Sequence, residues 1–379
     1  MSDQGNTATL TARLLERAAP KRTDFEDLVI VPLFAVVVAL ILGGVAMMAT
    51  NVDLATIGRS YVALASGSVG SINALSETIT AATPLIIAGL GVALGFRAGL
   101  FNIGAEGQIL MGGMAAVVVG FSLTGLPMIV HLPLALLAGI VAGALYAAIA
   151  GWIRAATGAH EVILTIMLNM ISYRLVDYML RMPAIQRPGR SDPISSSVLP
   201  SAELPRLLEW LGPNLRLHSG VFLMLAAVLF VYWLLFRSTI GFEFRASGEN
   251  PEAARFAGMR SGVIIVLVMA LGGALAGLAG ANQVLGVLGR ASSGFSAGIG
   301  FDALAVALLG RSHPFGVLVA GLLFGALEAG GRQMQVDAGV SIDLIGIIQS
   351  LIILFIAAPL VVRALFPWGF RKAAPTSKE

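Results

Sequence analysis

The sequence predicts an all-α, polytopic integral membrane protein with about ten transmembrane helices, some of them broken or re-entrant. The first observation is composition: 57% of the 379 residues are hydrophobic and 12% are charged, whereas soluble domains carry about 25% charged residues. The second is that apolar runs close to the length of a bilayer crossing recur along the chain. The third is small residues at four-residue spacing, such as Gly139 and Gly143, which let helix backbones approach closely in lipid.

The elements follow from the apolar runs. The first run begins near Leu28 after a polar segment and is too long for the apolar core of a signal peptide. The ten expected spans are Leu28–Ala49, Ile79–Leu94, Ile103–Phe121, Pro127–Ile153, Val162–Leu180, Val221–Phe236, Val263–Leu285, Ala297–Leu309, Phe315–Ala329 and Leu344–Val362. The second and the eighth are short for a bilayer that needs about 20 residues. We therefore expect broken or tilted helices there, and nine or eleven crossings are also compatible with the pattern.

Basic residues predict the orientation and the division of the chain. Arg13, Arg17 and Lys21 precede the first span, and Arg363 and Lys372 follow the last. Because basic segments stay cytoplasmic, both termini are expected inside, which requires an even number of spans. Residues 1–27 and 363–379 are then cytoplasmic tails, and residues 28–362 form the transmembrane domain. The Arg-containing loop at 181–216 is placed outside and is the main conflict with this rule.

A polar, glycine-rich stretch lies between apolar runs, GFRAGLFNIGAEGQILMG from Gly95 to Gly112. It carries Asn102, Glu106 and Gln108, although a charged side chain near the bilayer centre costs about 2.5–3.5 kcal/mol. Such a stretch lines something polar or ends one helix and starts the next. The segment Gly286–Gly300 is a weak echo of it, and interrupted segments in duplicated halves are typical of a transporter's substrate path.

The loop at residues 238–260 predicts a short cytoplasmic helix from Pro251 to Ala257. Asn250 is a good N-cap and Pro251 suits the first helical position. Glu252 favours the positive end of the helix dipole, Ala253 and Ala254 are strong helix formers, and Gly258 can end the helix. A helix this short is marginal alone. It is either an ordinary capped loop or a segment that another surface receives.

These two stretches resemble the permease subunits of ATP-binding-cassette (ABC) importers in the group that includes ribose, branched-chain amino acid and nucleoside permeases. The sequence from Gly99 to Gln108, GLFNIGAEGQ, resembles the signature of the nucleoside and simple-sugar branch. The sequence from Gly248 to Ala254, GENPEAA, resembles the cytoplasmic coupling segment shared more widely in the family. The resemblance covers about residues 79–362.

The resemblance implies a subunit that imports nucleosides or related simple sugars across a bacterial inner membrane and is not itself an enzyme. Its implied partners are a cytoplasmic ATPase, a second permease subunit and an external substrate-binding protein. No lysine here follows a glycine, so the phosphate loop of ATP-binding proteins is absent and ATP must bind elsewhere. No cofactor and no metal site are expected, since the chain has no cysteine and its four histidines share no ligand-like spacing. The net charge of +3 gives no indication of a nucleic-acid partner.

Two sets of residues follow from this interpretation. A neutral, hydroxyl-rich solute is expected to meet amides and carboxylates in the membrane, although each of these side chains could instead cap a broken helix. The expected path residues are Asn102, Glu106, Gln108, Asn169, Asn282, Gln283 and Asp302. The expected coupling residues are Asn250, Pro251, Glu252, Ala253, Ala254 and Arg255. Ala254 is expected on the face that docks into the ATPase.

Other functions stay open at this point. Glu106, Asp302 and Glu328 could be ion sites of a transporter driven by an ion gradient, although such a carrier does not need the capped helix at Pro251. A membrane enzyme is remote, because no nucleophile–base arrangement is visible in the sequence. Within the importer interpretation, simple sugars stand close behind nucleosides as the solute, and branched-chain amino acids stand further off.

Overall fold

The computed structural model describes residues 31–212, 215–341 and 343–357. The two predicted tails, 1–27 and 363–379, lie outside the described residues. The chain divides into two compact units, one made of residues 1–52 and 346–379 and the other of residues 53–345. The first unit contains α3 (Val31–Ala49) and most of α15 (Asp343–Ala357). Both of these helices are strongly apolar.

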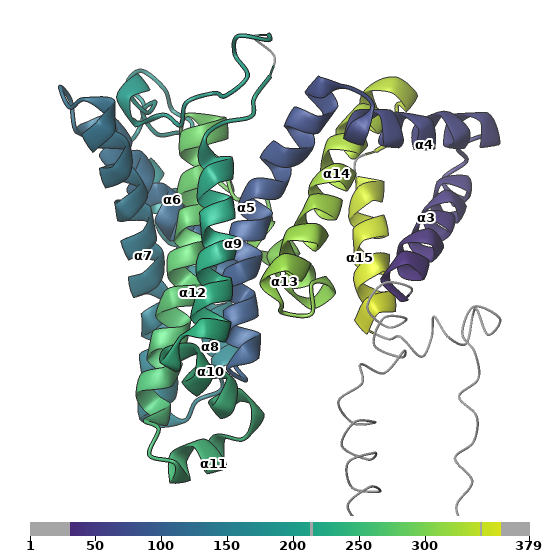
Figure 1. Cartoon of the computed structure of the whole chain (residues 1–379). Coiled ribbons are helices and arrows are strands. Elements are labelled where there is room, and N and C mark those ends of the chain that lie inside the picture. The colour runs from purple at the N-terminus through teal and green to yellow at the C-terminus, as the bar shows by residue number, and fades with distance from the viewer. Residues whose placement is uncertain (1–30, 213–214, 342, 358–379) are drawn as a thin grey trace, which may run out of the picture. The chain divides into compact units, whose positions relative to one another are not determined.

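The second unit holds the remaining helices, and α5 (Ile72–Arg97) is at its centre (Figure 1). Most of α5 is buried, and it packs against α4, α9, α12, α13 and α14. The other elements of the unit, in chain order, are α4 (Leu54–Val69), α6 (Ala105–Ser122), α7 (Met128–Thr157), α8 (Glu161–Leu180), η2 (Pro200–Ala202), α9 (Gly220–Arg237), α10 (Thr239–Glu249), α11 (Pro251–Phe256), α12 (Ser261–Gln283), η3 (Val284–Leu288), α13 (Ile299–Leu309) and α14 (Pro314–Ala338). All regular structure in the described residues is helical, apart from isolated β-bridges.

Seven helices among the described residues are long and apolar enough to cross a membrane: α5, α6, α7, α8, α9, α12 and α14. Each coincides with one predicted span. The other three predictions fall on α3, on α15 and on α13, which has 11 residues. At 1.5 Å per residue α13 is about 16 Å long, roughly half a bilayer core, as expected for a broken or re-entrant segment. The multi-pass, all-helical class is confirmed, and the number ten stays a prediction.

The prediction that the span at Ile79 is short was wrong, because α5 begins at Ile72 and has 26 residues. The hydropathy pattern breaks at Ser76, Glu77 and Thr78. In the structure these side chains have protein partners: the Ser76 hydroxyl accepts the Leu217 N–H at 3.0 Å, and the Thr78 hydroxyl donates to the Ser68 carbonyl at 2.7 Å. A polar helix end is stable where its side chains find such partners. The sequence also gave no indication of α4 and α10.

Glycine contacts hold α7 against α12, as the four-residue spacing predicts. A Cβ placed on Gly143 would lie 2.3 Å from the Gly273 carbonyl oxygen, and one on Gly277 would lie 2.2 Å from that of Gly139. Neither position has space for a side chain. The two backbones are therefore in direct contact.

The loop between α8 and α9 folds back over neighbouring helix ends. Its Leu204 N–H donates to the carbonyl of Leu285 in η3 at 3.0 Å, and its Val198 N–H donates to that of Gly289, just after η3, at 2.9 Å. Leu199 N–H donates to the Gly120 carbonyl of α6 at 2.9 Å. In Figure 1 this loop and α11 lie at opposite ends of the second unit. The unit therefore has one end covered by this loop and another that carries α10 and α11.

Candidate functional site

The polar stretch from Gly95 to Gly112 forms a bend between α5 and α6. Gly99 has a φ of +71°, and Leu100 N–H donates to the Gly95 carbonyl at 2.9 Å. The buried Asn102 accepts the Gly104 N–H at 2.9 Å and exchanges hydrogen bonds of 3.1 and 3.2 Å with the Gln108 amide. These two predicted path residues are thus paired with each other and hold the start of α6.

Asn169 on α8 braces the same bend. Its amide oxygen accepts the Gly107 N–H at 2.9 Å, and its amide nitrogen donates to the Ile103 carbonyl at 2.9 Å. The side chain is 1% exposed. Asn169 therefore ties α8 to the first turn of α6 in this structure.

Glu106 is fully buried and joins three segments. Its carboxylate accepts the Tyr173 hydroxyl at 2.9 Å, the Ser296 hydroxyl and the Gly300 N–H at 2.7 Å. A Cβ placed on Gly300 would lie 2.2 Å from the Glu106 nitrogen. The two glycine-rich segments singled out in the sequence are therefore in direct contact, where α6 and α13 begin. Solute contact by Asn102, Glu106, Gln108 or Asn169 would require these bonds to be exchanged, and it stays a prediction.

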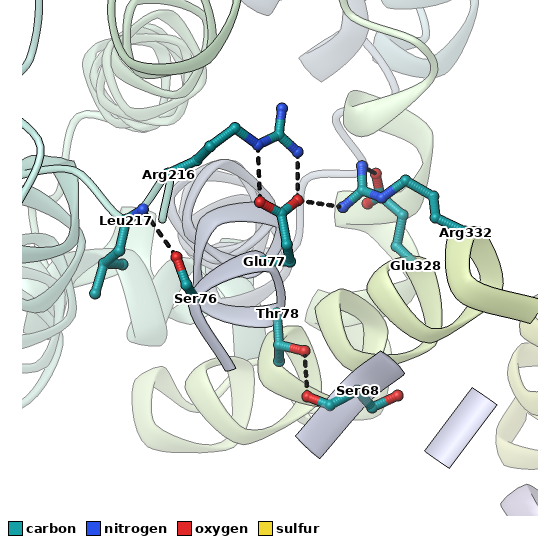
Figure 2. Close-up of polar contacts among 8 residues, drawn as sticks. All are labelled: Ser68, Ser76, Glu77, Thr78, Arg216, Leu217, Glu328 and Arg332. Atoms are coloured by element: carbon teal, nitrogen blue, oxygen red, sulfur yellow. Dashed lines mark hydrogen bonds and ion pairs between the residues drawn. The ribbon is translucent and has the colours of Figure 1, made fainter. Parts of the chain in front are cut away.

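A cluster of two carboxylates and two guanidinium groups lies toward the end of the unit opposite α11. Figure 2 shows Arg216 and Arg332 reaching the Glu77 carboxylate from two sides. Arg216 Nε donates to Glu77 at 2.7 Å, and Arg332 lies 3.7 Å from Glu77 and 3.3 Å from Glu328. The hydrogen bond to Glu77 holds the pKa of the Arg216 guanidinium above its usual range. This ionic cluster connects the α8–α9 loop to α5 and α14.

The sequence reasoning missed most of this cluster. Glu77, Arg216 and Arg332 looked like isolated charges at soft span boundaries, since they are far apart in the chain. The available signal was the formal balance of two acidic and two basic residues that would each be costly alone in a membrane. Only the fold brings them together.

A small cavity of about 40 Å³ lies beside the ionic cluster. Its walls include Thr80 of α5, Gln283 of α12, Ile299 of α13 and Glu328 of α14. Thr80 is 4% exposed, and its hydroxyl has no hydrogen-bond partner among the described residues. Gln283, a predicted path residue, is therefore at a polar space inside the helical unit.

Asn282, the residue before it, is fully buried with an unused amide. Neither its oxygen nor its nitrogen has a partner in the part of the chain that the structure describes. His218 Nδ1 accepts the Gly220 N–H at 3.2 Å, whereas its Nε2 likewise lacks a described partner. Burial, with a smaller effect of the Arg206 charge, lowers the pKa of His218 to about 4. Buried polar groups without partners each cost about 1–3 kcal/mol, so a bound molecule or water that paired with these atoms would stabilise this region.

Glycines close tightly around this pair. A Cβ on Gly220 would lie 2.1 Å from the Asn282 amide nitrogen, and one on Gly286 would lie 2.6 Å from His218. Gly286 belongs to η3, a π-helical turn that continues α12. Such turns occur frequently at functional sites.

Asp302 is in the first turn of α13, where the helix dipole favours a carboxylate. No described side chain donates a hydrogen bond to it. The structure therefore divides the predicted path residues between the bend (Asn102, Glu106, Gln108 and Asn169), the end of α12 (Asn282 and Gln283) and the start of α13 (Asp302). No group of three His, Cys, Asp or Glu side chains that could hold a metal ion occurs within the described ranges.

The short helix predicted in the 238–260 loop is present as α11. Asn250 caps it by accepting the Ala253 N–H at 3.0 Å, Pro251 is its first residue, and Gly258 follows with a φ of +87°. The expectation that Ala254 faces a partner was wrong, because Ala254 is 3% exposed and packs against the chain itself. The sequence sets the ends of this helix but not its rotation. The outward residues are Pro251, Glu252, Ala253, Arg255 and Phe256, and Phe256 is 93% exposed.

The segment before α11 touches the bend directly. A Cβ on Gly248 of α10 would lie 2.3 Å from the Arg97 carbonyl oxygen and 2.9 Å from the Gly99 nitrogen. The two sequence stretches that carried the resemblance are thus adjacent. A displacement of α10 would be felt at the bend.

Residues 74–357 match the family model described as the permease component of branched-chain amino acid transport systems. The chain is 39% identical to the guanosine ABC transporter permease protein of Bacillus subtilis, over 88% of this chain and 94% of the relative. It is 40% identical to the glucose ABC transporter permease protein of Haloferax volcanii, over 86% of each. It is 33% identical to a nucleoside ABC transporter permease protein of Lactococcus lactis, over 89% and 93%. No solved structure matches it.

Proposed function

This chain belongs to the family of permease components of branched-chain amino acid transport systems, and on that premise we propose that its solute is a nucleoside or a related simple sugar. It is a multi-pass ABC-transporter permease, and its relatives are transporter subunits rather than enzymes. The guanosine, nucleoside and glucose permeases, each at least 33% identical over at least 86% of this chain, carry the choice of solute. Branched-chain amino acids, an ion-gradient carrier and an enzyme are less favoured.

Family membership implies an ATPase and a substrate-binding protein as partners. We further propose that a second, different permease subunit completes the membrane pore, that the membrane is a bacterial inner membrane, and that both termini are cytoplasmic. In this orientation α11 meets the ATPase, and the α8–α9 loop faces the binding protein. The exposed Phe256, flanked by Arg255, supports this assignment of α11. A large exposed apolar side chain with a neighbouring charge is typical of an interface anchor.

The proposed mechanism starts at α11. ATP binding closes the ATPase and displaces α11 together with α10. Gly248 then pushes on the bend at Gly99, and α6 carries the movement through Glu106 to the start of α13. The ends of α12 and α13 open toward one side and then the other. Among the seven path residues, Asn282 and Gln283 are the best candidates for solute contact, because the amide of Asn282 has no described hydrogen-bond partner and Gln283 lines the cavity.

Reconstitution tests the solute class and the energy source. The permease, its ATPase, its binding protein and any second permease are placed in proteoliposomes, and labelled guanosine, glucose and leucine are offered separately. We expect ATP-dependent uptake of guanosine or glucose that survives dissipation of ion gradients. Uptake of leucine alone, or uptake that needs an ion gradient and no ATP, would contradict the proposal.

A further inference from the structure

The cavity beside the ionic cluster contains hydrogen-bonding capacity that the protein itself does not use. Thr80 is one of its wall residues; the residue is 4% exposed, and its hydroxyl has no hydrogen-bond partner among the described residues. A buried hydroxyl that makes no hydrogen bond costs about 1–3 kcal/mol of stability. A ligand group that both donates and accepts would remove that cost.

The charges around the cavity favour a neutral ligand. Glu77 and Glu328 balance Arg216 and Arg332, and the four side chains are linked by ion pairs (Figure 2). A charged ligand would find no unpaired side chain of opposite charge among these four residues. A neutral molecule needs only hydrogen bonds, which the walls provide in both directions.

The types of group at the walls match hydroxyl groups on adjacent carbon atoms. The Glu328 carboxylate accepts hydrogen bonds, the Gln283 amide donates and accepts, and the Thr80 hydroxyl does both. A carboxylate that binds ribose hydroxyls is a recurring solution in nucleotide-binding proteins. The cavity of about 40 Å³ exceeds the roughly 10–15 Å³ that one water needs, so it admits a hydroxyl-bearing edge of a ring rather than a whole nucleoside.

We propose that Thr80, Gln283 and Glu328 form a subsite for the adjacent hydroxyl groups of a ribose or hexose ring. The inference rests on the proposed function, and it deepens it: nucleosides and simple sugars share such hydroxyls, whereas they share no base. The subsite selects the sugar part of the solute. Selection of the base is left to other groups.

Thr80→Val tests the subsite, because valine keeps the shape and removes only the hydroxyl. The hydroxyl has no described partner, so the variant should fold at least as well as the wild type, which thermal unfolding of the purified complex checks. Thr83→Val is the matched control one turn along α5, where the hydroxyl donates to the Ile79 carbonyl at 2.7 Å. The readout is the ratio of uptake efficiencies for guanosine and 2′,3′-dideoxyguanosine. The same binding protein is present throughout, so its own preference cancels between variants.

We expect Thr80→Val to lower this ratio by about two- to tenfold, the loss of one hydrogen bond, by weakening guanosine uptake and sparing the dideoxy analogue. Glu328→Gln should lower the ratio as well, and Thr83→Val should not. An unchanged ratio in a well-folded Thr80→Val complex that still imports guanosine would overturn the subsite and leave the proposed function standing. A wild-type complex that imports neither guanosine nor glucose would instead overturn the proposed function, and the subsite with it.

Discussion

Replacement of Glu106 by glutamine separates a bracing role from a solute-binding role at the bend. The carboxylate accepts three hydrogen bonds, from Tyr173, Ser296 and Gly300, and it is fully buried. Glutamine keeps the shape. Its oxygen can still accept the Gly300 N–H, and its amide group can donate to the two hydroxyls, which rotate to accept. The three contacts survive without their charge.

The magnitude follows from those contacts. Hydrogen bonds to charged groups contribute about 1.5–3 kcal/mol and neutral ones about 0.5–1.5 kcal/mol, so three of them lose about 3 kcal/mol together. Relief of the cost of burying a charge offsets part of this loss. We expect a net destabilisation of about 1–3 kcal/mol for Glu106→Gln, and more for Glu106→Ala, which leaves three donors unpaired.

The assay measures the yield and thermal unfolding of the assembled complex alongside the concentration dependence of guanosine uptake. If Glu106 braces the junction of α6 and α13, yield and unfolding temperature fall, while the apparent affinity of the surviving complexes is unchanged. Glu209→Gln, at an exposed position of the α8–α9 loop, is the control and should change neither. Normal yield and stability with an apparent affinity weakened about tenfold would refute the bracing argument and place Glu106 in contact with solute.

Four further expectations follow from the same geometry. Asn282→Leu should raise or preserve thermal stability, since it removes a buried amide without described partners. The same variant should reduce uptake, and normal uptake would show that Asn282 is not in the substrate path. Gly248→Ala should uncouple ATP hydrolysis from uptake, because overpacking against backbone typically costs about 1–3 kcal/mol. Gly262→Ala is the control and should leave coupling unchanged, since its Cβ would meet only Ala155 at 3.7 Å. Equal coupling in the two variants would refute the contact argument. Phe256→Ser should weaken ATPase binding by about 2 kcal/mol or more in a pull-down with the permease folded normally, and undiminished binding would refute the interface at α11. The pKa of His218 in the folded protein, about 4, lies below its ordinary value of 6.5. Its contribution to stability is therefore complete above pH 6.5 and is lost as the pH falls toward 4, on the order of 3 kcal/mol. His218→Gln should flatten the dependence of unfolding temperature on pH between 6.5 and 4, and an unchanged dependence would contradict the lowered pKa of His218.

The sequence predicted those features that depend on local chemistry. Long apolar runs predicted seven of the helices, and the cap at Asn250 with Gly258 predicted α11 within one residue. The first two turns of α5 could not be predicted, because the polar groups of Ser76 and Glu77 are satisfied by Leu217 and Arg216, which are far away in the chain.

The candidate site was predictable in composition and not in arrangement. Amides and a carboxylate in an apolar chain indicate something polar, but the pairing of Asn102 with Gln108 and of Glu106 with Gly300 depends on how the two bends meet. The inward rotation of Ala254 likewise depends on packing within the chain rather than on the caps of α11.

The glycine contacts between α7 and α12 have a mechanical consequence. An interface made of side chains can adjust by changing rotamers, whereas Gly139, Gly143, Gly273 and Gly277 bring backbone against backbone with no rotamer available. We therefore expect the two helices to move together as one rigid body. Contacts of the same kind join α12 to α5 and α6, since a Cβ on Gly91 would lie 2.5 Å from the Gly272 carbonyl oxygen and one on Gly112 would lie 2.3 Å from the Gly277 Cα. The sliding that opens and closes the path is then confined to interfaces that contain longer side chains.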